Sequence, residues 1–331
     1  MVTTGSAQTA LNFTDEAFAE QMREALDAVE ERLLKAVNTD QPLLRESGSH
    51  LINAGGKRFR PMLTLTASHL GDPAAPGIID AAVALELTHL ATLYHDDVMD
   101  DAAVRRGAPS ANARWNNSVA ILTGDYLFSQ AAQIMAELGP DAVRVQASTF
   151  ARLVRGQINE TMPRPDGIDA VEWHLGILSE KTGSLIATCA KFGAWFAGAT
   201  TETTAIAEQF GEVFGVAFQI ADDIIDIVSD QSGKTPGTDL LEGVPTLPVL
   251  YALAGTDPAD ARLRELVSGP VAEADLPEAL ELLRASRALE EAQATLHRYQ
   301  DRARLLATTL PEGAARRAMV DICDYMVQRE A

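Results

Sequence analysis

Residues 81–101 read AAVALELTHLATLYHDDVMDD, an apolar run that passes directly into a cluster of acidic residues. Strand alternation is absent, and helical periodicity extends from Gly77 to about Asp101, so the stretch predicts an apolar helix. Asp96, Asp97 and Asp100 form a D-D-x-x-D pattern. Because each residue advances a helix by about 100°, these three carboxylates are expected on one helix face.

The same helical spacing extends through most of the chain. Between Asp15 and Thr39, apolar side chains recur every three or four residues, with Thr14 as the expected N-cap. Comparable patterns cover residues 119–138, 141–161, 170–200, 203–229 and most of 276–328. Strand alternation is not sustained anywhere, and no Asn-Gly or Asp-Gly hairpin signal separates two apolar runs. Residues 229–248 hold several glycines and prolines and predict a long loop. The sequence predicts an all-α fold.

Composition excludes several classes of protein. The chain has 331 residues, 47% of them hydrophobic, and a formal net charge of −20. The hydrophobic fraction excludes a disordered chain, and the acidic excess argues against nonspecific nucleic-acid binding. Length alone suggests two domains. No repeat or linker divides the chain, however, so we expect a single domain of residues 1–331, with residues 1–13 disordered.

Neither targeting nor membrane signals are convincing. Residues 183–200, GSLIATCAKFGAWFAGAT, are long enough to span a membrane, but Lys191 at their centre would cost about 2.5–3.5 kcal/mol. Small residues and polar flanks favour a buried helix there. The N-terminus lacks the basic and apolar regions of a signal peptide. Two cysteines are too few for a disulfide framework, which favours a cytoplasmic location.

A second D-D-x-x-D pattern lies about 125 residues after the first, at Asp222, Asp223 and Asp226. Neighbouring carboxylates among isoleucines repel one another and lose hydration, so positive charge is expected beside them. Hard oxygen ligands in this number favour Mg²⁺, which often completes its coordination with substrate phosphates. One copy alone would be interpreted as a solvated helix end. Two copies predict acidic clusters that face each other across a cavity and hold several Mg²⁺ ions around one diphosphate.

Two basic clusters complement the acidic ones. Residues 55–61, GGKRFRP, place three cations on a glycine-led turn into a helix, where backbone N–H groups also favour anions. Arg105 and Arg106 follow the first acidic cluster by about one helical turn. Arginine offers phosphate two parallel hydrogen bonds, and lysine offers a point charge. Ordinary surface charge pairing is the alternative, but cations beside suspected metal ligands in so acidic a chain favour diphosphate binding.

Six motifs occur in order along the chain: GGKRFRP (55–61), HDDVMDDAAVRRG (95–107), GQINE (156–160), KTG (181–183), FQIADDIID (218–226) and GKTPGTDLLEG (233–243). Together they resemble the trans-isoprenyl diphosphate synthase (polyprenyl synthetase) family of medium or long chain type, over nearly the whole chain. The resemblance implies the isoprenoid synthase fold, a large helical bundle around a central catalytic cavity, and a homodimer. It also implies the Mg²⁺-dependent head-to-tail condensation of isopentenyl diphosphate with an allylic diphosphate. Three ions per active site and transient membrane contact on product release are expected.

The resemblance assigns roles by motif position. The expected metal ligands are Asp96, Asp97, Asp100, Asp222, Asp223 and Asp226. The expected contacts of the allylic diphosphate are Arg105, Lys181, Gln219 and Lys234. Those of isopentenyl diphosphate are Lys57, Arg60, His89 and Arg106, with Arg58 of the same turn also counted among the substrate-binding residues. Thr182 would stabilise the carbocation, and the departing diphosphate would take the proton. Without the family, His89 would be interpreted as a core histidine.

The resemblance also implies that product length depends on an apolar tunnel between helices. Thr88, Ala91 and Thr92 precede the first aspartate, and small residues there leave room for a long chain. We therefore expect an all-trans product of thirty to fifty carbons, of the type used for quinone side chains. Val244 stands where many family members carry a lysine, so Lys234 is expected to matter more. The alternatives are a geranylgeranyl (C20) diphosphate synthase, a class I terpene cyclase and a non-catalytic helical partner subunit.

Overall fold

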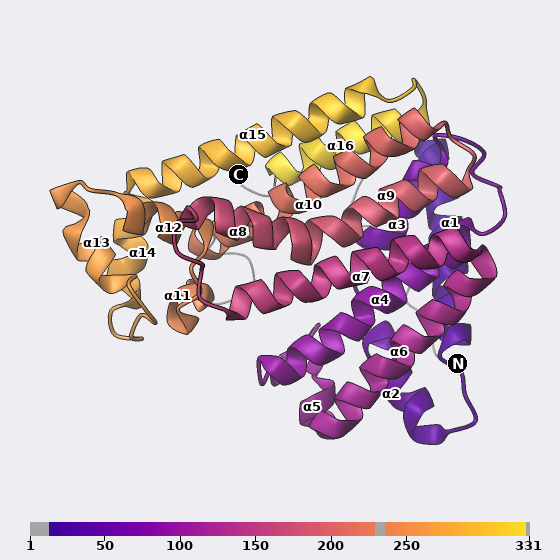
Figure 1. The fold of residues 1–331 in the computed structure, drawn as a ribbon, viewed down its shortest axis with the longest axis horizontal. Helices are drawn as coiled ribbons and strands as arrows, with labels where there is room; N and C mark the ends of the chain where they lie inside the picture. Colours follow the sequence, from indigo (N-terminus) through magenta and orange to yellow (C-terminus); the bar gives the residue numbers. More distant parts are fainter. Residues whose placement is uncertain (1–12, 229–235, 329–331) are drawn as a thin grey trace. The chain divides into compact units, whose positions relative to one another are not determined.

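The computed structural model describes residues 13–228 and 236–328, and within these ranges the chain is almost entirely helical (Figure 1). This confirms the prediction of an all-α fold. The described residues form two compact units, which we describe separately. Unit 1 comprises residues 13–149, 188–208 and 310–321. Unit 2 comprises residues 150–187, 209–228, 236–309 and 322–328.

Unit 1 is built around one buried helix. Its first helices are α1 (Glu16–Ala36), α2 (Pro42–Asn53), α3 (Phe59–Ser68) and α4 (Ile78–Met99). Helix α4 is apolar on nearly every side, as a helix enclosed by others must be. It packs most extensively against α6 (Asn117–Leu138) and also contacts α1 and α3. The acidic end of the quoted stretch is therefore held by a rigid, buried element.

A short antiparallel hairpin follows α4. Strand β1 (Val104–Arg105) pairs with β2 (Ala108–Pro109), so that Arg105 lies opposite Ala108. The short helix α5 (Ala111–Arg114) then leads into α6. Four further helices contribute residues to both units: α7 (Pro140–Thr161), α9 (Ser184–Phe196), α10 (Thr201–Val228) and α16 (Ala314–Gln328).

Two expectations about the start of the chain need correction. Asp15, not Thr14, caps α1, because its side chain accepts a hydrogen bond from the Phe18 amide. The Thr14 hydroxyl instead donates to Asp321 over 2.9 Å. Phe13 was expected within a disordered terminus, but it is buried and its ring meets Phe18 edge-on at 5.0 Å. Apolar contact with α1 therefore orders the chain one residue earlier than expected, whereas residues 1–12 lie outside the described chain.

Unit 2 contains the remaining helical elements. In chain order they are α8 (Ala170–Leu178), the π-helical turn η1 (Ser179–Gly183), α11 (Thr238–Glu242), α12 (Leu247–Ala254), the 3₁₀ turn η2 (Pro258–Asp260), α13 (Ala261–Leu266), α14 (Leu276–Arg284) and α15 (Arg287–Thr309). Within the predicted 229–248 loop, the described residues therefore include one short helix, and α12 begins before the predicted end.

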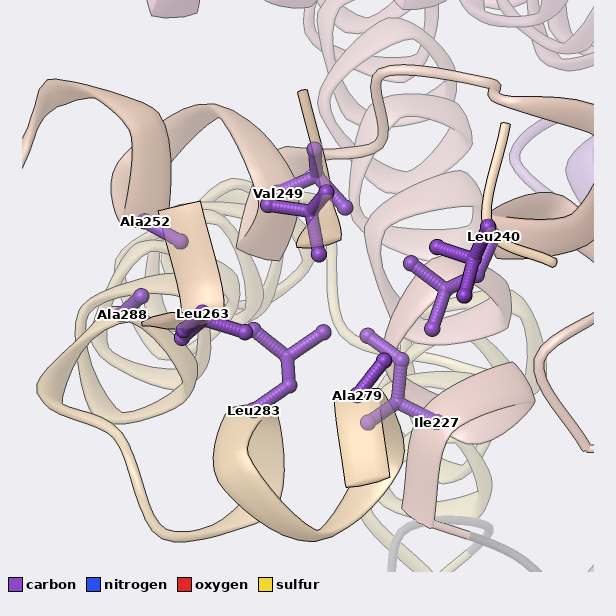
Figure 2. Packing of buried hydrophobic residues seen from close by; sticks show 10 residues of the cluster. Ile227, Leu240, Val249, Ala252, Leu263, Ala279, Leu283 and Ala288 are labelled. Atoms are coloured by element: carbon purple, nitrogen blue, oxygen red, sulfur yellow. The ribbon is translucent and has the colours of Figure 1, made fainter. Parts of the chain in front are cut away.

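The end of α10 is anchored in an apolar cluster of unit 2 (Figure 2). Ile227 is buried there together with Leu240 from α11 and Val249 from α12. Leu283 of α14 belongs to the same cluster. Because Ile227 directly follows Asp226, this packing fixes the helix that carries the second acidic cluster.

No helix among the described residues is long and apolar enough to cross a bilayer. The apolar stretch that was considered as a membrane span lies within η1 and α9 and the turn after them. Its Lys191 pairs with Glu208 of α10 over 3.1 Å.

Candidate active site

The first acidic cluster closes the C-terminal end of α4. Asp96 and Asp97 lie in the last turn, and Asp100 is the C-cap, its amide donating to the Asp96 carbonyl over 2.8 Å. Asp97 is buried, Asp96 is half-buried and Asp100 is exposed. Carboxylates at this end of a helix meet the negative pole of its dipole. The arrangement is therefore unfavourable unless cations lie close by.

Asp97 has one paired and one unpaired oxygen. Its Oδ1 accepts from Nε of Arg105 over 2.6 Å, while its Oδ2 is buried and has no hydrogen-bond partner among the described residues. Burial raises the pKa of Asp97, although Arg105 opposes the shift. A buried carboxylate oxygen that lacks a donor is costly. Such an oxygen fits a site that accepts a cation.

The basic turn of unit 1 has the predicted form. Gly55 and Gly56 have φ values of 89° and 140°, Arg58 is left-handed at 46°, and α3 starts at Phe59. Lys57 is exposed, whereas Arg60 is half-buried. Burial lowers the pKa of Arg60. Arg58 is buried and donates to Glu30, Glu86 and backbone carbonyls.

The structure brings Arg106 against the glycine-led turn, and the charges of both basic clusters act on His89 of α4. The pKa of His89 lies well below its usual value, first because the half-buried ring is desolvated and then because of the charges of Arg60, Arg106, Arg58 and Arg105. Nη1 of Arg106 donates to the carbonyl oxygens of Leu51, over 3.0 Å, and Gly55. Cations that are almost fifty residues apart in sequence thus share one region, and Arg105 connects it to Asp97.

The second acidic cluster lies on α10 in unit 2, where Gln219, Asp222, Asp223 and Asp226 are all half-buried. Oδ2 of Asp223 lies 3.3 Å from Nε2 of His174. Oδ2 of Asp226 accepts from the Asp239 amide over 3.2 Å. These contacts hold α8 and the start of α11 against the acidic face. His174 was not predicted, because it lies outside every recognised motif.

The GQINE and KTG motifs meet in unit 2. Lys181 and buried Thr182 lie in the π-helical turn η1, a geometry that often marks functional sites. Gly156 of α7 packs directly on this turn, since a Cβ there would lie 2.6 Å from the Lys181 nitrogen. Nζ of Lys181 pairs with Glu160 over 2.5 Å. The two motifs therefore form one structural site.

Sequence analysis missed the ion pairs that surround this turn. Arg152 of α7 donates to Glu180 over 3.0 Å and to Glu212 over 2.7 Å. Ser179 also donates to Glu212 over 2.7 Å. The only sequence signal was their position beside the recognised motifs. These contacts connect η1 to α7 and α10 and stabilise its position.

The residues expected to set product length lie on α4. Thr88 and Ala91 are buried, and Thr92 is half-buried. The Thr88 hydroxyl donates to the Ala84 carbonyl over 2.8 Å and accepts from Gln146 of α7 over 3.1 Å. Their role in product length stays a prediction. Lys234 lies outside the described residues, and Val244 is 36% exposed.

No group of three or more His, Cys, Asp or Glu side chains converges as a metal site among the described residues. The six predicted metal ligands are divided between unit 1 and unit 2. The available donors nevertheless suit a hard divalent cation, because they are carboxylates and Asp97 has a buried oxygen without a partner. Binding of Mg²⁺ stays a prediction.

Comparisons with known proteins agree with this description. The family model described as Polyprenyl synthetase matches residues 41–283. Nonaprenyl diphosphate synthase from Mycobacterium tuberculosis is 47% identical over 99% of both chains. A crystal structure of geranylgeranyl pyrophosphate synthase from Corynebacterium glutamicum, complexed with calcium and isoprenyl diphosphate, is 44% identical with a TM-score of 0.88, covering 96% of this chain and 99% of that one. A decaprenyl diphosphate synthase structure from Rhodobacter capsulatus is 30% identical with a TM-score of 0.85, at the same coverage.

Proposed function

Because the chain belongs to the polyprenyl synthetase family, it is a prenyltransferase, and we propose that it condenses isopentenyl diphosphate with an allylic diphosphate. The observation that carries this proposal is the arginine cluster of unit 1. The charges of four arginines act on His89 in a chain whose net charge is −20, and one of them, Arg105, donates to Asp97 of the first acidic cluster. Cations concentrated at one place in so acidic a protein suit a diphosphate ligand.

The chemistry requires a good leaving group. The C–O bond of the allylic diphosphate breaks, C1 of the resulting cation bonds to C4 of isopentenyl diphosphate, and a proton leaves C2. When bound, Mg²⁺ would neutralise the diphosphate and help it depart. We propose that Asp96, Asp97, Asp100, Asp222, Asp223 and Asp226 hold three such ions. The relative that was crystallised with calcium and isoprenyl diphosphate supports the need for a divalent ion.

The chain's own cations would position both substrates. Lys57, Arg60 and Arg106 would bind isopentenyl diphosphate beside a neutral His89, whose depressed pKa leaves one ring nitrogen free of a proton. Arg105 and Lys181 would bind the allylic diphosphate, together with Gln219 and Lys234. Thr182 lies in the π-helical turn next to Lys181, and its oxygen would stabilise the carbocation.

We propose a long-chain product of thirty to fifty carbons. The nonaprenyl and decaprenyl diphosphate synthases among the relatives support this length. We infer the room for such a product from the small side chains of Ala91 and Thr92 on α4. A C20 product is the second candidate, because one similar structure is a geranylgeranyl pyrophosphate synthase.

We also propose that the enzyme is a single-domain homodimer in the cytoplasm. The family resemblance supports a dimer, and so do Ile121 and Leu122 of α6, which are 43% and 61% exposed. Apolar side chains exposed next to each other suit a subunit interface. Light scattering coupled to size-exclusion chromatography measures the mass directly, and a monomer at micromolar concentration would overturn the dimer.

The decisive experiment uses radiolabelled isopentenyl diphosphate with each short allylic primer, with Mg²⁺ present or chelated. We expect product only with Mg²⁺, and chromatography after dephosphorylation gives its length. Asp96→Ala and Asp222→Ala should each lower kcat by orders of magnitude while circular dichroism stays unchanged. Turnover that survives complete chelation would contradict the metal assignment, and wild-type rates in either variant would remove that cluster from the mechanism.

A further inference from the structure

Arg58 lies in the middle of the basic turn, yet its side chain is only 2% exposed. Every N–H of its guanidinium has an acceptor within unit 1. Nε and Nη2 donate to the two carboxylate oxygens of Glu30, the second over 3.1 Å, and Nη2 also reaches the Ile52 carbonyl over 2.9 Å. Nη1 donates to the Gly55 carbonyl over 3.2 Å and to Glu86 over 3.4 Å. A guanidinium has five N–H donors, so none is left for a diphosphate.

The acceptors come from three separate segments. Glu30 belongs to α1, Glu86 belongs to α4, and the two carbonyls end α2 and start the glycine turn. Glu86 is itself 2% exposed and lies 4.0 Å from Nη2 of Arg106. Arg58 therefore ties the turn to two helices, and the same carboxylate also faces the second basic cluster.

The backbone around Arg58 needs this support. Arg58 and Arg106 both have left-handed φ angles, 46° and 54°, which cost energy in residues with a side chain. Gly56 between them packs so tightly that a Cβ would lie 2.9 Å from the Arg106 guanidinium and 3.1 Å from that of Arg58. Side-chain contacts thus hold the turn in a conformation that the backbone alone would disfavour.

We infer that Arg58 is a positioning residue rather than a substrate ligand, and that Glu30 and Glu86 are its partners in holding Lys57, Arg60 and Arg106 ready for isopentenyl diphosphate. This inference rests on the proposed function. It gives the N-terminal helix α1 a role in substrate affinity that acts through the Glu30–Arg58 pair.

Glu30→Gln separates the two interpretations by the sign of its effect. If Arg58 positions the turn, loss of the Glu30 charge loosens the turn and weakens isopentenyl diphosphate binding by about tenfold, since small displacements of binding groups are costly. If Arg58 is instead a ligand restrained by Glu30, the same change frees its guanidinium and tightens binding. Calorimetric titration with isopentenyl diphosphate measures the Kd, and kinetics give the KM for both substrates.

The matched control is Asp80→Asn, which breaks the 2.8 Å pair between Arg32 of α1 and Asp80 of α4 and so loosens the same two helices elsewhere. We expect its Kd to stay within about twofold of wild type. Arg58→Lys should weaken binding as Glu30→Gln does, because one ammonium cannot replace the five-donor fork. Glu30→Gln and Arg58→Lys should raise the KM for isopentenyl diphosphate but leave kcat and the KM for the allylic substrate nearly unchanged.

The outcomes are distinguishable. Wild-type protein that neither binds nor consumes isopentenyl diphosphate overturns the proposed function and this inference with it. An active wild type whose Glu30→Gln variant binds equally well or more tightly overturns the inference alone. So does an Asp80→Asn variant that weakens binding as much as Glu30→Gln, because the effect would then be general loosening of α1.

Discussion

The contact between Gly156 and the π-helical turn allows one substitution to separate stability from catalysis. In Gly156→Ala the new Cβ would lie 2.6 Å from the Lys181 nitrogen, 2.9 Å from its Cα and 3.0 Å from the Glu180 carbonyl carbon. Ordinary contacts begin at 3.4 Å, so the backbone of Lys181 must recede by about 0.8 Å. All three contacts are with backbone atoms, which cannot rotate away as a side chain could.

Two opposing effects set the change in stability. Overpacking a close contact costs about 1–3 kcal/mol, while alanine in place of glycine within a helix gains about 1 kcal/mol. We therefore expect Gly156→Ala to lower the free energy of unfolding by about 1 kcal/mol. Displacing a catalytic group by about 1 Å can cost about a hundredfold in rate. Because Lys181 and Thr182 would both move, turnover should fall far more than stability.

The control is Gly176→Ala on α8 in the same unit, where the new Cβ would meet nothing within 4 Å apart from its chain neighbours and the backbone of its own helix. It should gain up to about 1 kcal/mol and keep wild-type turnover. Urea denaturation followed by circular dichroism gives the stabilities, and initial rates with both diphosphates give the activities. If Gly156→Ala is stabilised like its control and remains fully active, the π-helical turn does not depend on this close contact.

Three further predictions follow from unit 1. In Gly124→Ala the Cβ would lie 2.3 Å from Nε2 of His95, so the ring must leave its 3.1 Å contact with the Ile121 carbonyl. We expect the free energy of unfolding, measured by urea denaturation, to fall by about 1 kcal/mol. In a His95→Ala background the same substitution should cost much less, and equal losses in both backgrounds would refute the prediction. Ala91→Phe should shorten the product on chromatography, whereas an unchanged length would place the tunnel floor elsewhere. Burial and four arginines depress the pKa of His89 in the folded chain. As the pH falls below 6.5, His89 therefore binds a proton in the unfolded chain while it is still neutral in the folded chain. Stability should therefore decline between pH 6.5 and 5 by up to about 1.4 kcal/mol per pH unit, and His89→Gln should reduce that slope in urea titrations at each pH.

Much of the fold follows from local pattern. Helix α4 was placed to within two residues, because its apolar spacing and the acidic residues at its end are properties of neighbouring positions. The glycine-led turn before α3 was likewise readable from its sequence. The N-cap of α1 was not, since Thr14 and Asp15 are both good capping residues and only the geometry shows which side chain reaches the Phe18 amide.

The site was predictable in its residue types but not in its partners. The motifs named the aspartates and the cations, because this chemistry needs particular side chains at particular helical spacings. They could not show that Arg58 pairs with Glu30 and Glu86, each 28 residues away, or that His174 meets Asp223 across 49 residues. Such pairings depend on how helices pack, and helix packing is decided by side-chain shape and burial over the whole unit rather than by any short stretch of sequence.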